Sequence, residues 1–135
     1  MKAKGILSGL PGLARVTVHP GQVLVYPRHT PPGVFVVLAG VICRFAEGTA
    51  PEAACGDLRD AADGPFAVPA PEEVGEPAHA GVAATTDAEL LFVPRSVVLA
   101  RTDLPGVLAA AGIEVAPLKD RSKERGKIVA SRGTR

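Results

Sequence analysis

Residues 16–45 read VTVHPGQVLVYPRHTPPGVFVVLAGVICRF. Three valine-rich runs are separated by Pro-Gly and by Thr-Pro-Pro-Gly, a fourth follows Ala-Gly directly, and the four span residues 16–18, 23–26, 34–38 and 41–45. Runs of β-branched residues between such turn residues are typical of β-strands, so this stretch predicts four consecutive strands. Gly21 and Gly40 are expected to be structural turn glycines, because glycine tolerates the positive φ of a tight turn. The predicted arrangement is a meander that closes into a roll.

The remainder of the chain adds strands and short helices to this unit. Residues 46–64 are rich in Ala, Gly and acidic residues and predict a loop with one short strand around 57–59. Further apolar runs predict strands at 65–68, 81–86 and 88–93. Helical spacing or helix-start residues predict short helices at 6–13, 69–75 and 104–111. The predicted fold class is mainly β, an antiparallel β-roll (jelly-roll or cupin-like) of about eight strands with short flanking helices.

Composition predicts one domain followed by a tail. The chain has 135 residues, of which 47% are hydrophobic and 21% charged, which suits a single packed core. We place the roll domain at residues 1–117 and a C-terminal tail at 118–135. The tail carries seven Lys or Arg against two acids and few apolar residues, so a disordered, basic tail is predicted.

Charge and hydropathy limit the expected cellular location of the protein and the classes of its binding partners. The net charge of +1 gives no global field for nucleic acid or acidic membranes. No apolar run approaches the roughly 20 residues that span a bilayer, and residues 1–12 lack the apolar core of a signal peptide. A cytoplasmic protein without membrane contact is therefore expected.

The order of these segments resembles the cyclic nucleotide-binding domain, the sensor β-roll of catabolite-activator-type regulators. The resemblance rests on HPGQVLVYP, then GVFVVLAGVI, then ATTDAELLFVPRS and a following helix, and it extends from about Leu10 to Leu108. It implies a small-ligand pocket in the roll. A DNA-binding output domain is not expected, because only 31 residues follow Leu104.

The resemblance also implies a phosphate-binding cassette, in which a Gly-Glu pair contacts the ribose and an Arg pairs with the cyclic phosphate. When the strand at 82–84 is used as the anchor, the Arg position falls on Ala78 and the Gly-Glu pair on Ala67-Val68. The actual Gly75-Glu76 pair is too close to that strand. The candidate ligand-binding residues are therefore Glu76 and the nearest basic groups, His79 and Arg95.

Other chemistry has few residues to support it. The metal-binding spacing of cupins places its ligands on Pro27, His29 and Gly33, and one imidazole cannot hold a catalytic ion. No metal and no cofactor are expected. The two cysteines, Cys43 and Cys55, are expected to be reduced. No arrangement of nucleophile and base predicts an enzyme.

Two functional hypotheses remain open. The first is an interaction, assembly or scaffold module that has lost cyclic nucleotide binding, with a protein partner or self-association favoured over nucleic acid. The alternative is a regulatory module that binds a cyclic nucleotide or another small molecule in the roll.

Overall fold

The computed structural model describes residues 12–46 and 57–118 of the chain. The helical turns predicted at 6–13 fall almost entirely outside these residues, as do Cys55 and all of the predicted tail beyond Leu118.

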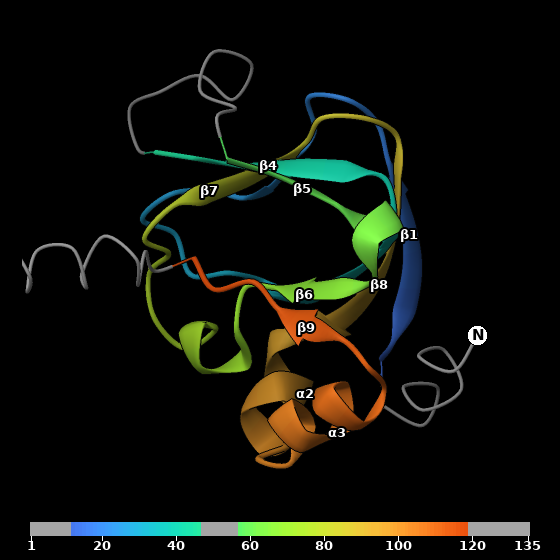
Figure 1. Cartoon of the computed structure of the whole chain (residues 1–135). Helices are drawn as coiled ribbons and strands as arrows, with labels where there is room; N and C mark the ends of the chain where they lie inside the picture. Colours follow the sequence, from blue (N-terminus) through green and yellow to red (C-terminus); the bar gives the residue numbers. More distant parts are fainter. Residues whose placement is uncertain (1–11, 47–56, 119–135) are drawn as a thin grey trace, which may run out of the picture.

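The described residues form two β-sheets that face each other (Figure 1). The five-stranded sheet has the order β1-β8-β3-β6-β9, and the four-stranded sheet has the order β2-β7-β4-β5. The bounds are β1 Ala14–Val18, β2 Val23–Val25, β3 Gly33–Ala39, β4 Val41–Phe45, β5 Asp57–Asp60, β6 Phe66–Val68, β7 Gly81–Ala84, β8 Ala88–Pro94 and β9 Glu114–Val115. The mainly-β roll predicted from the sequence is confirmed.

The predicted meander of the first four strands is wrong, because no two of these four strands pair with each other. β1 pairs with β8, and β2 pairs with β7, so the first four strands alternate between the two sheets. Gly40 makes one of these crossings between β3 and β4 with a φ of 102°. A Cβ at this position would lie 2.5 Å from the Asp87 carbonyl oxygen, so the crossing needs glycine for its conformation and for space.

Alternating side chains of the central strands supply two separate core layers. On β3, Val34 and Val36 pack with a cluster beneath the helices, whereas Phe35 and Val37 face the space between the two sheets. Successive residues of a strand point to opposite faces, and both faces of β3 are buried here. This explains why the strand reads as an unbroken apolar run rather than as an alternating one.

Two short helices cover the outer face of the five-stranded sheet. They are α2 (Arg95–Ala100) and α3 (Leu104–Ala110), and their buried residues Val98, Leu104 and Leu108 join the outer core layer. The prediction of a helix at 104–111 is confirmed, but α2 was not predicted, because Pro94 indicated only the end of a strand. Two single 3-10 turns, η1 (Ala61–Asp63) and η2 (Pro71–Glu73), complete the fold, and η2 stands where a short helix was predicted.

The turn between α2 and α3 carries an exposed ion pair. The Arg101 guanidinium donates two hydrogen bonds of 2.8 Å to the Asp103 carboxylate. These bonds lower the pKa of Asp103 and raise that of Arg101.

None of the helices in the described part of the chain is long and apolar enough to cross a membrane.

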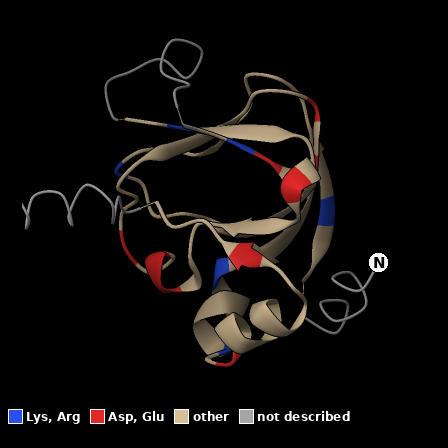
Figure 2. Cartoon of the chain, viewed as in Figure 1, with Lys and Arg blue, Asp and Glu red and all other residues tan. Residues whose placement is uncertain are grey.

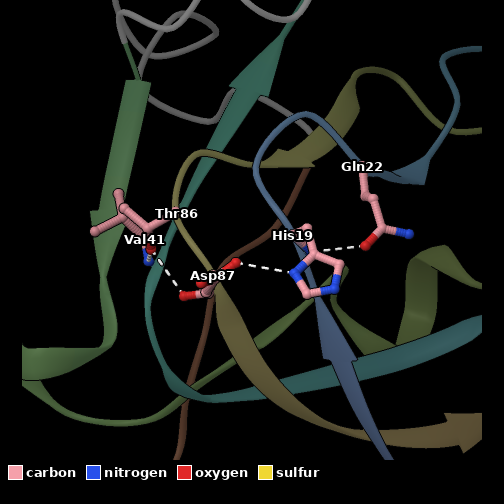
Figure 3. A network of polar contacts seen from close by, with 5 residues as sticks. All are labelled: His19, Gln22, Val41, Thr86 and Asp87. Carbon is pink, nitrogen blue, oxygen red and sulfur yellow. Dashed lines mark hydrogen bonds and ion pairs between the residues drawn. The ribbon is translucent and has the colours of Figure 1, made fainter.

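Three turns meet at one end of the roll, which we call the turn end (Figure 3). His19 Nδ1 lies 3.0 Å from Asp87 Oδ1, and the His19 N–H donates to the Gln22 side chain. The Thr86 hydroxyl accepts from the Val41 N–H at 2.9 Å and donates to the Asp87 carbonyl. These contacts join the β1–β2, β3–β4 and β7–β8 turns, so the turn end is closed by exposed hydrogen bonds between loops.

Candidate functional site

The opposite end of the roll is built around the connection between β6 and β7, residues 69–80. We call this end the mouth. In the register of the four-stranded sheet, Phe45 at the end of β4 pairs with Gly81 at the start of β7, whereas Ile42 and Ala84 pair toward the turn end. The connection that the resemblance equates with the phosphate-binding cassette therefore borders the mouth.

The chain's own residues 114–118, here called the docked segment, lie against this connection, where the Leu118 N–H donates to Glu73 of η2. β9 pairs in parallel with β6, with Val115 opposite Ala67, and the Ala116 N–H donates to the Ala67 carbonyl at 2.7 Å. In Figure 1 the segment runs from β9 along the five-stranded sheet to the end that carries η2. It extends that sheet by one strand and then enters the mouth.

Leu118 places an aliphatic side chain inside the roll. It is 2% exposed and belongs to the core layer between the sheets, together with Val82, Phe66 and Ile42. Full burial of a leucine side chain contributes about 1.5–3 kcal/mol. Leu118 was assigned to the basic tail on sequence grounds, yet the packed structure continues through it.

Two charged side chains hold the backbone around Leu118. The Glu73 carboxylate, 8% exposed, accepts from the Leu118 N–H and from the Ala70 N–H, both at 2.8 Å. Arg44 on β4 donates from Nη1 to the carbonyl oxygens of Pro117 and Leu118, at 3.4 and 3.2 Å. Burial of a carboxylate is unfavourable in free energy unless its oxygens accept hydrogen bonds, and the two N–H groups supply such bonds to Glu73.

A second pair of contacts anchors the start of the docked segment. Arg59 on β5 forms an ion pair with Glu114. The same guanidinium lies over the Phe66 ring, 4.7 Å from its centroid. Because Arg59 and Glu114 belong to different sheets, this ion pair bridges the β5 and β9 edges of the roll.

A hollow of about 600 Å³ lies outside the mouth, lined by Arg28, Glu76, Pro77, Ala78 and His79. Two of the predicted site residues meet here, since His79 Nε2 lies 3.5 Å from Glu76 Oε1. Arg28, which was not predicted, is held beside them with a φ of 70°, and its N–H donates to the Ala78 carbonyl at 2.9 Å. The third predicted residue, Arg95, begins α2 and is not among the lining residues; its N–H donates to Pro32.

Sequence reasoning missed the residues that hold the docked segment. Arg44 sits in an apolar strand, and Glu73 sits next to another glutamate, Glu72, which is exposed. A charged residue within a predicted core strand was the available signal for Arg44, because such a residue is rarely buried without a partner. Glu73 offered no comparable signal.

From the sequence we expected two reduced cysteines and no bound metal. Cys43 is disulfide-bonded, so its expected reduced state is wrong. That expectation followed from an assumed compartment and not from the surroundings of the residue; the one other cysteine, Cys55, lies outside the described residues. In residues 12–46 and 57–118, no group of three or more His, Cys, Asp or Glu is placed to hold a metal ion.

Comparisons with known proteins support this architecture at the level of the fold. No family model and no curated protein matches the chain. Among solved structures it is similar to the C-linker/CNBHD of zELK channels crystallized in the presence of cAMP, with 15% identity and a TM-score of 0.56 over 86% of this chain and 60% of that chain. It is also similar to DNR from Pseudomonas aeruginosa, with 15% identity and a TM-score of 0.56 over 96% of this chain and 59% of that one.

A third similar structure is matched over most of both chains. PKAR CBD2 bound to Sp-2Cl-cAMPS has 12% identity and a TM-score of 0.50, over 87% of this chain and 92% of that chain. The chain has the fold of a cyclic nucleotide-binding domain. These neighbours are regulatory domains and not enzymes. The chain spans about 60% of the length of the zELK and DNR chains, and at these identities the likeness concerns the fold alone.

Proposed function

We propose that this protein is a non-catalytic cyclic nucleotide-binding-like module that does not bind cyclic nucleotides and acts through protein contacts. The observation that carries the proposal is the burial of Leu118 in the roll, with its N–H on Glu73 and its carbonyl on Arg44. A docked segment of the chain's own sequence stands where the resemblance would place a ligand.

The charges at the mouth argue in the same direction. A cyclic phosphate is an anion, and the Glu73 carboxylate at the mouth would meet it as a like charge, while the Arg44 guanidinium at the mouth donates to the carbonyls of Pro117 and Leu118. The position of the phosphate-binding Arg carries Ala78, which is buried. Loss of the Arg and of the ribose-binding Glu removes two charge-assisted contacts of roughly 1.5–3 kcal/mol each. That loss corresponds to about two to four decades in affinity.

The test is calorimetric titration of the full chain with cyclic AMP and cyclic GMP. We expect no binding at up to about 1 mM nucleotide, since both the contacts and the space are missing. A matched control is the Leu118→Ser chain, which weakens the apolar anchor and leaves Glu73 and Arg44 in place. A dissociation constant of about 10 μM or tighter for the unaltered chain would refute the proposal.

A second candidate function is small-ligand sensing at the hollow of Arg28, Glu76 and His79. Arg28 is held in a left-handed conformation that costs a non-glycine residue about 1–3 kcal/mol, and such strain clusters at ligand sites. A thermal-shift screen of cyclic mononucleotides and dinucleotides tests it. A hit that is lost in His79→Ala would favour this function, whereas a hit lost in Arg95→Ala would place the ligand at α2 instead.

A further inference from the structure

We infer that the mouth is a receptor site for an extended peptide with an aliphatic side chain, and that a segment of a partner protein binds there in place of the docked segment. This inference rests on the proposed function. The docked segment supplies the pattern: a strand residue, a small residue, a proline and then a leucine.

The polar groups of the mouth match a peptide backbone. Glu73 accepts one backbone N–H of the docked segment, and Arg44 donates to two successive carbonyl groups. The Ala67 carbonyl accepts a further N–H, from Ala116. Main-chain contacts of this kind can be made by any chain in the same extended path, as in peptide recognition by strand addition.

The selectivity of the site lies in the space filled by Leu118. This side chain packs among apolar residues of both sheets, including Phe66 and Val82, and is 2% exposed. An aliphatic side chain fits there, and a charged one would have to be buried without a partner. The carboxylate of Glu73 also disfavours an anionic peptide at this point, and the turn that carries it, η2, is coloured as acidic in Figure 2.

Because the docked segment occupies the mouth, a partner peptide has to displace it in order to bind. A tethered segment acts at an effective concentration in the millimolar range. A partner peptide with the same intrinsic affinity therefore competes only at millimolar levels, unless the docked segment is weakened. The docked segment is thus a built-in competitor, and any change that loosens Leu118 raises the apparent affinity for a peptide in trans.

The experiment uses the full-length chain and a fluorescein-labelled peptide of residues 113–119, IEVAPLK, with blocked ends. Fluorescence anisotropy is measured on the unaltered chain and on Leu118→Ser, with circular dichroism to verify that the variant is folded; Leu118→Ala replaces it if it is not. We expect Leu118→Ser to bind the peptide at least about tenfold more tightly than the unaltered chain.

Two controls define the site. The same peptide with serine in place of leucine should bind at least about tenfold more weakly, because one buried apolar side chain is lost. Adding Glu73→Gln to the Leu118→Ser chain should weaken binding by about tenfold, whereas adding the exposed Glu76→Gln should not change it. Equal binding of the two peptides, or equal binding by the unaltered and Leu118→Ser chains, would overturn the inference.

The same assay separates this inference from the proposed function. Displacement of the labelled peptide from Leu118→Ser by 100 μM cyclic AMP, with binding of that nucleotide by the unaltered chain, would refute the proposed function and leave the peptide site standing. Absence of peptide binding together with absence of nucleotide binding would refute the peptide site alone.

Discussion

The two ends of the roll are closed by different means. At the turn end, loops from both sheets are joined by hydrogen bonds between exposed groups, such as His19 with Asp87 at 3.0 Å. At the mouth, a segment from the far end of the described chain is held by a buried carboxylate, a half-buried guanidinium and a buried leucine. The turn end is therefore held by exposed polar contacts and by the conformation of its turns, and the mouth is held by buried contacts.

This difference assigns different roles to the two ends. Exposed polar contacts contribute little free energy each and can be exchanged for water. Buried contacts are worth more, and they are also specific, because removing one partner leaves the other desolvated and unpaired. The turn end is thus suited to holding the chain path, and the mouth to recognising a segment.

The largest expected effect concerns backbone conformation at the turn end. Gly40→Ala combines a left-handed conformation with a Cβ only 2.5 Å from the Asp87 carbonyl oxygen. We expect it to lower the free energy of unfolding by about 3 kcal/mol or more. Gly21→Ala is the matched control: its φ is 89°, but no atom lies within 4 Å of the added Cβ, so about 1–2 kcal/mol is expected. Urea denaturation measures both, and equal losses would show that space at Gly40 is not limiting.

The next effect concerns the anchor of the docked segment. Leu118→Ala removes most of a buried side chain and should lower the free energy of unfolding by about 2 kcal/mol. This value is at the low end for such substitutions, because the end of the docked segment can relax into the space that is left. The melting temperature should fall by roughly 5–10 °C. Removal of residues 119–135 is the comparison, and it should change the melting temperature by no more than about 1–2 °C, since that stretch has few apolar residues to bury. A larger loss on removal of the tail would place part of the mouth's stability beyond Leu118.

A smaller effect is expected from the buried carboxylate. Glu73→Gln keeps an oxygen acceptor but loses the charge that strengthens two hydrogen bonds of 2.8 Å, so about 1–2 kcal/mol is expected. Glu76→Gln, whose carboxylate is exposed and lies 3.5 Å from His79, should cost less than about 0.5 kcal/mol. Chemical denaturation of the two variants side by side compares burial directly. Similar losses of unfolding free energy in the two variants would mean that the buried Glu73 carboxylate stabilises the fold no more than the exposed Glu76 carboxylate does.

The smallest effect is expected at the turn end. The side chains of His19 and Asp87 are 73% and 75% exposed, so their ion pair should be worth less than about 0.5 kcal/mol. Asp87→Asn should leave the urea midpoint nearly unchanged at pH 7. A loss of unfolding free energy comparable with that of Glu73→Gln would show that the turn end and the mouth are stabilised to the same degree.

Much of the fold could be predicted from the sequence because it depends on local patterns. The runs that became β3 and β4 are short, apolar and β-branched, and turn residues separate them. Helix α3 carries Pro105 in its first turn and ends shortly before Gly112, and these are common helix-start and helix-stop residues. Gly21 and Gly40 were expected to need positive φ, and both have it. In each case the neighbours in sequence are also the neighbours that decide the structure.

Pairing and the candidate site depended on contacts between distant residues. β1 pairs with β8, which is distant in sequence, and no local pattern distinguishes this arrangement from a meander. The sequence alone predicted that this chain makes a roll, and the resemblance placed Ala78 at the position of the cassette's Arg. Only the tertiary structure decided what fills the mouth: Arg44, Glu73 and Leu118 are far apart in the chain, and each is unremarkable in its local context. Their proximity follows from β9 pairing with β6, which carries Leu118 into the roll and supplies the N–H that the buried Glu73 carboxylate requires.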